Sequence, residues 1–153
     1  MKRKAIICDI DGTILDISHR LHWVKGKDTN WEEFLREDNI LKDTPIPMTI
    51  EIIRNLNRNY PILFVTGRNK GIEDITIKQI RHYCKLREFY IFTRTDGDHR
   101  PDTEIKEELY HKHIEPYYDV KCVFDDKTSV VNLWRSLGLL TYQIDPSDYD
   151  DGF

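Results

Sequence analysis

The residues of this chain that could carry out chemistry are polar residues, and one glycine, placed directly after short apolar runs. They are Asp9, Asp11, Thr66, Gly67, Arg68, Asp125 and Asp126, with Asp102 and Lys106 following the apolar run at 89–92. Carboxylates that gather around one point repel each other unless a cation neutralises them. Oxygen ligands favour a hard cation such as Mg²⁺, and the same cluster could then receive a dianionic phosphate. The pattern therefore predicts magnesium-assisted phosphoryl chemistry.

The spacing of Asp9 and Asp11 suggests two different roles for these carboxylates. Residues two apart in a strand point to the same side, so both side chains could flank one phosphorus atom. Asp9 would attack phosphorus and form a covalent aspartyl-phosphate. Asp11 would protonate the leaving oxygen and later activate water. Donors for the phosphate oxygens would come from Thr66, the Gly67 amide, Arg68 and Lys106.

Most of these signals have an ordinary structural explanation when each is taken alone. Thr66–Arg68 could be only a turn, Asp125–Asp126 a solvated loop and Lys106 a solvated helix lysine. The stretch Asp9–Thr13 is the exception, because it points to a site by itself. All of these groups fall in order at expected strand ends or in the next helix, and this joint pattern carries the prediction.

The elements that must position these groups alternate between strands and helices. Apolar runs of four to six residues predict buried strands at 4–8, 61–65, 89–92, 120–124 and 140–144. Helical spacing of apolar residues predicts helices at 47–58, 69–84, 102–113 and 127–137. This alternation predicts an α/β fold, doubly wound, with a mostly parallel five-stranded sheet. Ligands of such sheets bind beyond the carboxyl ends of the strands, where the polar residues would converge.

One segment interrupts this alternation, and we expect it to form a small cap. Residues 16–44 separate the first strand from the first core helix and include an expected short helix at 30–36. Long insertions in compact domains are often functional lids, and a surface elaboration closing over the core edge explains the segment equally well. We expect a single domain over residues 1–153, with the cap as its insertion.

Composition bears on the partners of the chain, on membrane insertion and on cysteine-based sites. The 153 residues carry a net charge of −4, so a polyanionic partner would need a local basic patch. No run approaches the roughly 20 apolar residues of a membrane span. The three cysteines show no CxxC spacing, which gives no indication of a zinc site or a disulfide framework and fits a reducing cytoplasm. We expect Cys8 and Cys122 to be buried, and we infer no role for the acidic segment 145–153.

The motifs resemble those of the haloacid dehalogenase (HAD) superfamily. Asp9-Ile10-Asp11-Gly12-Thr13-Ile14 resembles its first motif, Thr66 its second, Lys106 its third and Asp125-Asp126 its fourth. The resemblance implies a HAD-like Rossmannoid fold and a phosphatase that works through an aspartyl-phosphate with Mg²⁺. It also implies that the metal is held by Asp9, the backbone carbonyl of Asp11, and Asp125, with Asp126 in a supporting place.

A closer resemblance is to the 3′-phosphatase domain of bacteriophage polynucleotide kinases. It is carried by Lys106-Glu107-Glu108, Lys112-His113-Ile114-x-Pro116, Asp119-Val120-Lys121, Asp125-Asp126, Val130-Val131-x-x-Trp134-Arg135 and the Thr66-Gly67-Arg68 stretch. It implies a 3′-phosphate at a DNA or RNA end as the substrate, in a bacterial or phage-infected cell. By the same resemblance, Arg20 and Arg68 would contact phosphate, and Asp102 would orient Lys106 or Arg68.

Three functions remain open at this point. No GxxxxGK[ST] kinase loop occurs in the sequence, so we expect a stand-alone phosphatase or one half of a split system with a separate kinase or ligase partner. A phosphatase of nucleoside monophosphates would use identical chemistry, and a non-catalytic binding domain is the third alternative. The cap tryptophans Trp23 and Trp31 could stack a terminal base, although packing within the cap is the more ordinary role. Basic residues expected near the opening are Arg20, Lys25, Lys27, Arg68, Lys70, Arg94 and Arg100.

Overall fold

The computed structural model describes residues 1–146, so most of the acidic segment 145–153 lies outside the described residues. Its centre is a five-stranded sheet in the order β5-β4-β1-β6-β7, and each neighbouring pair is parallel. The strands are β1 (Arg3–Cys8), β4 (Ile62–Asn69), β5 (Phe89–Arg94), β6 (Tyr118–Asp125) and β7 (Thr141–Gln143). The five strands expected from the apolar runs are therefore confirmed.

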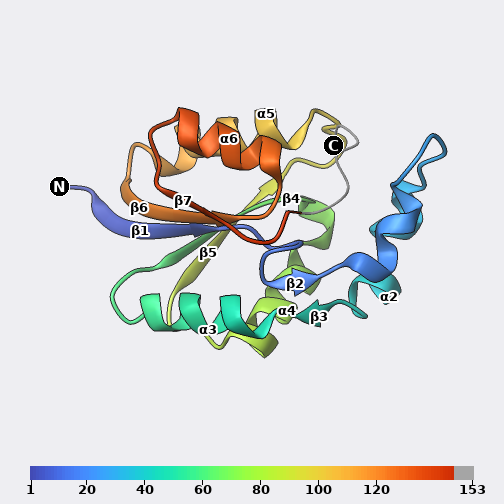
Figure 1. Ribbon diagram of the computed structural model, residues 1–153, viewed down its shortest axis with the longest axis horizontal. Coiled ribbons are helices and arrows are strands. Elements are labelled where there is room, and N and C mark those ends of the chain that lie inside the picture. The colour runs from blue at the N-terminus through green and yellow to red at the C-terminus, as the bar shows by residue number, and fades with distance from the viewer. Residues whose placement is uncertain (147–153) are drawn as a thin grey trace.

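Helices cover both faces of this sheet (Figure 1). The main helices are α3 (Pro47–Leu56), α4 (Glu73–Cys84), α5 (Asp102–Leu109) and α6 (Thr128–Ser136). Helices α3 and α4 lie against one face, and α5 and α6 lie against the other. This is the doubly wound arrangement that the alternation of elements predicts.

The side chains of β1 alternate between two hydrophobic cores. Ile6 and Cys8 belong to the core that also contains Ile53 of α3 and Ile80 of α4. Ala5 and Ile7 belong to a second core with Val130 and Trp134 of α6. Because both faces are buried, the strand reads as one continuous apolar run. This burial fixes the position of Asp9, the next residue along the chain.

The cap, residues 16–44, lies beyond the carboxyl ends of the strands, at the right of Figure 1. Its elements are β2 (Leu15–Asp16), η1 (Ser18–Trp23), α1 (Trp31–Phe34), α2 (Glu37–Ile40) and β3 (Thr44–Pro45). Strands β2 and β3 pair antiparallel and bring the two ends of the cap together. The helix expected at 30–36 is in fact α1, where the side chain of Asn30 accepts a bond from the Glu33 amide, followed by the separate α2.

Two expected element boundaries are wrong in an informative way. Thr66–Arg68 is not a turn, because β4 continues through it to Asn69, which pairs with Arg94 of β5. In place of the single helix expected at 102–113, the α-helix α5 ends at Leu109. A π-helical segment, η3 (Tyr110–Ile114), follows it directly. Strand β4 could not be extended to Asn69 from the sequence, because Arg68 reads locally as an exposed polar residue. In the structure its side chain is buried by residues distant in the sequence, such as Asp43.

Within residues 1–146, no helix has both the length and the apolar character needed to cross a membrane. Cys8 and Cys122 are buried as expected, and Cys84 is buried as well; all three are free thiols.

Candidate active site

The parallel register brings Asp9 and Asp125 to the same edge of the sheet. Cys8 at the end of β1 pairs with Phe124 of β6, so Asp9 and Asp125 each follow by one residue. The Asp9 amide donates to the Phe124 carbonyl at 2.9 Å, which fixes the backbone there. Both carboxylates are buried, as expected for groups that lie at the floor of a site rather than on its rim.

Lys106 of α5 joins these two carboxylates. Its Nζ donates to Asp9 Oδ1 at 2.9 Å and to Asp125 Oδ2 at 3.0 Å. Burial alone would lower the pKa of Lys106, but the charges of Asp125 and Asp9 raise it above its ordinary value. Lys106 therefore remains a cation in this buried position.

Asp125 is held by donors on both of its oxygens. Oδ1 accepts from the backbone amides of Asp126 and Lys127, at 2.9 and 3.3 Å. Oδ2 accepts from the indole Nε1 of Trp134 at 3.2 Å, in addition to Lys106. Trp134 is fully buried, so the second core of the domain also orients this carboxylate. Neither Trp134 nor its contact was part of the site predicted from sequence.

Asp9, Asp125 and Asp126 form a cluster that suits a metal ion. Each offers one carboxylate oxygen, and these three atoms all lie within 4.8 Å of one another. Burial and the charge of Asp125 raise the pKa of Asp9 well above its ordinary value. Additional positive charge at this point would keep Asp9 ionised. A purely oxygen donor set fits a hard divalent cation.

Asp11 has the opposite environment, although it is only two residues from Asp9. Arg68 Nη2 donates to Asp11 Oδ1 at 2.6 Å, and Arg20 Nη2 donates to the same oxygen at 3.1 Å. Burial alone would raise the pKa of Asp11, but the charges of Arg68 and Arg20 outweigh it and lower this pKa. The surroundings thus raise the pKa of Asp9 and lower the pKa of Asp11.

A carboxylate that the sequence did not single out, Asp43, completes this group. It is fully buried and bonds both arginines: Oδ1 accepts from Arg20 Nε at 2.8 Å, and Oδ2 from Arg68 Nη2 at 3.0 Å. The ring of His19 lies 2.7 Å from Asp43 Oδ1. Asp43 lies at the end of the cap, next to β3, and its sequence neighbourhood carries no motif that indicates a site.

Arg20 and Arg68, for which the resemblance implies phosphate contacts, both bond carboxylates in this structure. Arg20 is fully buried beside Asp11 and does not line the cavity described below. Arg68 does line the cavity, yet its guanidinium also bonds Thr76 and Gln79 of α4, at 3.0 and 2.7 Å. Both arginines therefore hold Asp11 and Asp43 in place through hydrogen bonds and opposite charge.

Asp102 has other partners than the expected Lys106 or Arg68. It bonds Arg94 Nη2 at 2.5 Å and lies 3.7 Å from Lys127 Nζ. It also lies so close to Gly67 that a Cβ there would overlap the Asp102 carboxylate. Asp102 is the first residue of α5, and its side chain contacts Arg94 of β5 and Gly67 of β4 rather than Lys106 of its own helix. Its position explains why residue 67 is a glycine.

These residues border a cavity of about 450 Å³ between the strand ends and the cap. Its polar lining includes Asp9, Asp11, Thr66, Gly67, Arg68, Asp102, Lys106, Asp126 and Lys127. Arg94 and Arg100 of the expected basic patch line it as well, whereas Lys25, Lys27 and Lys70 do not. The structure therefore brings together nearly all the residues expected from the motifs, with Asp125 just beneath the cavity wall and Arg20 behind Asp11.

Comparison with known proteins gives a family match over almost the whole chain. The family described as "Polynucleotide kinase PNKP phosphatase domain" matches residues 3–149. A relative from Autographa californica nuclear polyhedrosis virus, named as a bifunctional polynucleotide kinase/RNA ligase, is 26% identical over 138 residues. That match covers 90% of this chain but 19% of the viral protein, so the chain spans about a fifth of its relative's length.

Solved structures share the fold. A chain in the structure of the Pnkp1/Rnl/Hen1 RNA repair complex superposes with a TM-score of 0.79 at 24% identity, covering 97% of this chain and 44% of the other. A haloacid dehalogenase-like hydrolase from Streptococcus pneumoniae has a TM-score of 0.64 at 13% identity, covering 92% of this chain and 84% of the other. These likenesses place the chain within the HAD-like fold.

A first prediction concerns Gly12, whose φ is +79° and whose missing side chain leaves room for Asp126. Gly138, after α6, has φ +81° and open space within 4 Å of where a Cβ would lie, so it is a matched control. We expect Gly138→Ala to lower the free energy of unfolding by about 1–2 kcal/mol through backbone strain alone. Gly12→Ala should cost clearly more, because Asp126 must also move. Equal losses in chemical denaturation would contradict this account.

A second prediction concerns Asp43. Asp43→Asn keeps the side chain's size but leaves two buried arginines with one carboxylate fewer, so we expect a loss of about 3–5 kcal/mol in unfolding free energy. Asp38→Asn is the control in the same cap, because the Asp38 side chain is 74% exposed. Chemical denaturation of the two variants measures the difference. If both variants unfold like the wild type, the buried network does not stabilise the cap as described.

Proposed function

Because the chain belongs to the family of polynucleotide kinase PNKP phosphatase domains and is therefore a phosphatase, we propose that it removes 3′-phosphates from DNA or RNA ends through an aspartyl-phosphate at Asp9. The viral relative named as a polynucleotide kinase/RNA ligase supports a nucleic acid end as the substrate. The alternative substrate is a small molecule, a nucleoside monophosphate.

One observation carries the proposed chemistry. The Asp9 carboxylate lies in the cavity wall, bonded to Lys106 at 2.9 Å and grouped with Asp125 and Asp126. A carboxylate placed for attack on phosphorus needs a charged frame that fixes it and receives the negative charge of the substrate. Lys106 supplies a fixed positive charge at that point.

In the first step, an oxygen of Asp9 bonds to phosphorus while the bond from phosphorus to the 3′-oxygen breaks. The leaving oxygen takes its proton from Asp11 and departs as a hydroxyl. Arg68 and Arg20 hold the Asp11 side chain in one place. The negative charge of the bound phosphate raises the pKa of Asp11 from its lowered value, which favours the protonated form that this step needs.

In the second step, a water oxygen attacks the phosphorus of the aspartyl-phosphate and gives one proton to Asp11. The bond from phosphorus to Asp9 breaks, which releases inorganic phosphate and restores both carboxyl groups to their starting states. Thr66, the Gly67 amide and Lys106 supply donors to the phosphate oxygens during both steps, since all three residues line the cavity. Arg68, which also lines the cavity and bonds Asp11, adds positive charge near the phosphate.

A Mg²⁺ ion would be held by Asp9, the backbone carbonyl of Asp11, and Asp125, with Asp126 beside them. When bound, it would offset the combined negative charge of the carboxylates and the phosphate. The three clustered carboxylates support this assignment. We further place the enzyme in a reducing cytoplasm, as expected from its three free and buried cysteines.

A kinase or ligase partner also belongs to this proposal. The viral relative is named for kinase and ligase activities, and it is several times longer than this chain. These activities would come from another protein or from further segments of a longer chain. Residues 1–153 would form the phosphatase unit, with the cap at 16–44 as its insertion.

The substrate assignment is tested by a panel of phosphate monoesters in the presence of Mg²⁺. We expect the highest kcat/KM with 3′-phosphorylated DNA or RNA oligonucleotides, scored by phosphate release. The matched control is the same oligonucleotide phosphorylated at its 5′ end. A clear preference for 5′-mononucleotides would instead assign the enzyme to small-molecule substrates.

The role of Asp9 is tested by Asp9→Asn, which keeps the shape of the side chain but removes the attacking carboxylate. We expect kcat to fall by at least about 10³-fold, the loss typical of removing a nucleophile. Asp119→Asn is the control, because Asp119 is exposed and its side chain forms an ion pair only with Lys121 among the residues described. Circular dichroism checks that both variants fold. Undiminished hydrolysis by Asp9→Asn would contradict the mechanism.

Metal removal gives an independent test. We expect EDTA to abolish phosphate release and added Mg²⁺ to restore it. Saturating Mg²⁺ should also stabilise the folded wild type, by about 2.7 kcal/mol at 100 times Kd. Asp125→Asn should lose this stabilisation, as measured by thermal unfolding with and without Mg²⁺. Full activity in EDTA would rule out the metal assignment.

A further inference from the structure

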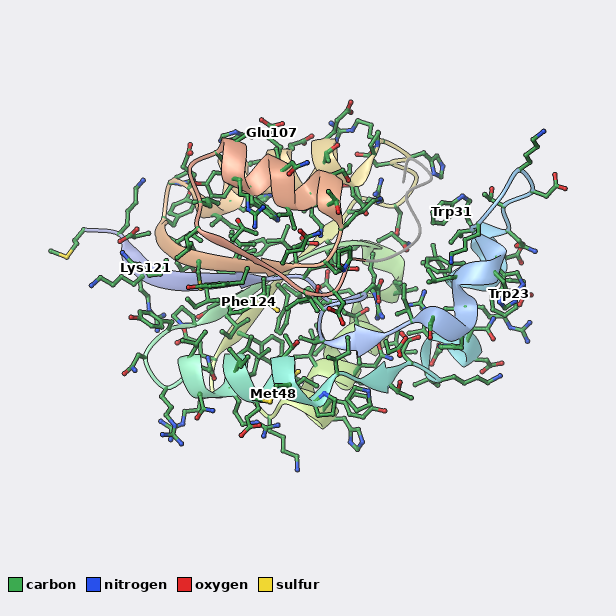
Figure 2. All side chains as sticks on the ribbon, in the orientation of Figure 1. Trp23, Trp31, Met48, Glu107, Lys121 and Phe124 are labelled. Carbon is green, nitrogen blue, oxygen red and sulfur yellow. The ribbon has the colours of Figure 1, made fainter. Side chains whose placement is uncertain are left out.

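The cap gives the cavity an apolar wall that the phosphate chemistry itself does not use. This wall consists of Ile17, Trp31, Phe34 and Leu35. Trp31 is 39% exposed, and Figure 2 shows it on the side of the cap that faces the sheet. Trp23, in contrast, packs against the hydrophobic core. The two cap tryptophans therefore differ, and only Trp31 is placed to meet a ligand.

The position of this wall is tied to the catalytic carboxylates through Arg20. The Arg20 guanidinium lies over the Phe34 ring, 4.5 Å from its centroid, and Nη1 donates to the Phe34 carbonyl at 3.1 Å. The same guanidinium bonds Asp11. Trp31 in turn packs edge-on against Phe34, with ring centroids 5.5 Å apart. The Trp31 ring is thus held in a defined position relative to the phosphate site.

The size and lining of the cavity fit a nucleotide better than a phosphate alone. A volume of about 450 Å³ lies within the range of about 300–1,000 Å³ that is typical of pockets for small organic ligands. A phosphate bound at Asp9 and Lys106 would occupy only the polar floor. The remaining space borders the aromatic side chains of Trp31 and Phe34, and stacking on aromatic rings is how proteins hold unpaired bases.

We propose that Trp31, supported by Phe34, is a stacking subsite for the base of the nucleotide that carries the scissile 3′-phosphate. This inference rests on the function proposed above and adds how the end is recognised. Stacking uses the flat face that every base has. The subsite therefore detects the presence of a terminal base and accepts all four bases.

The test compares two 3′-phosphorylated oligonucleotides that differ only in the last nucleotide, which carries a base in one and is abasic in the other. For Trp31→Ala, we expect kcat/KM to fall about 5- to 150-fold on the end with a base, mainly through KM. The abasic end should be hydrolysed as by the wild type. Trp31→Phe should retain most of the activity. Tyr117→Ala is the control, because Tyr117 is exposed and does not line the cavity.

An equal fall on both ends would overturn the subsite and leave Trp31 a structural role in the cap. The proposed function can fail separately. If the wild type hydrolyses mononucleotides but not oligonucleotides, the polynucleotide substrate is wrong. The same Trp31→Ala comparison between a 3′-mononucleotide and ribose 3-phosphate then decides the subsite. A wild type that hydrolyses none of these nucleotides overturns both proposals.

Discussion

The structure depends on holding five carboxyl groups close together at one end of a parallel sheet, four of them buried and Asp11 19% exposed. They are Asp9, Asp11, Asp43, Asp125 and Asp126. Removing an ion from water costs several kcal/mol unless a partner compensates. The compensating cations come from three separate elements, namely Arg20 of the cap, Arg68 of β4 and Lys106 of α5. The cap, the sheet and the helix layer must therefore all be in place before the site exists.

These cations divide the site into two halves with different electrostatics. Two arginines face Asp11 and lower its pKa, whereas burial and a neighbouring carboxylate raise the pKa of Asp9. Two carboxylates that are chemically identical and two residues apart thus acquire different properties from their surroundings. Such separation is the usual way in which one fold assigns distinct roles to paired acids. The half that contains Asp9, Asp125 and Asp126 is also the half whose carboxylate oxygens are close enough together to bind a cation.

Much of this arrangement could be predicted from sequence because it depends on local patterns. Apolar runs located the five strands, and chain order at their ends placed Asp9, Thr66, Lys106 and Asp125 at one edge. What the sequence could not supply was the choice of partners across the fold. Asp43 has no local motif, yet it joins two arginines from distant elements. Asp102 bonds Arg94 rather than Lys106 for the same reason, since the crossing of α5 over the strands sets its partner. The continuation of β4 through Thr66–Arg68 likewise reflects burial of Arg68 by the cap and α4.

The proposed mechanism requires that Asp9 itself becomes phosphorylated. The most direct measurement is peptide mass spectrometry of enzyme quenched in acid during turnover of a 3′-phosphorylated oligonucleotide. The Asp11→Asn variant, which lacks both the acid for the leaving oxygen and the base that activates water, is quenched and analysed in parallel. We predict one added phosphoryl group on the peptide that contains Asp9, located on Asp9 by fragmentation. Phosphate release with no phosphorylated enzyme in either protein, or a phosphoryl group on another residue, would contradict it.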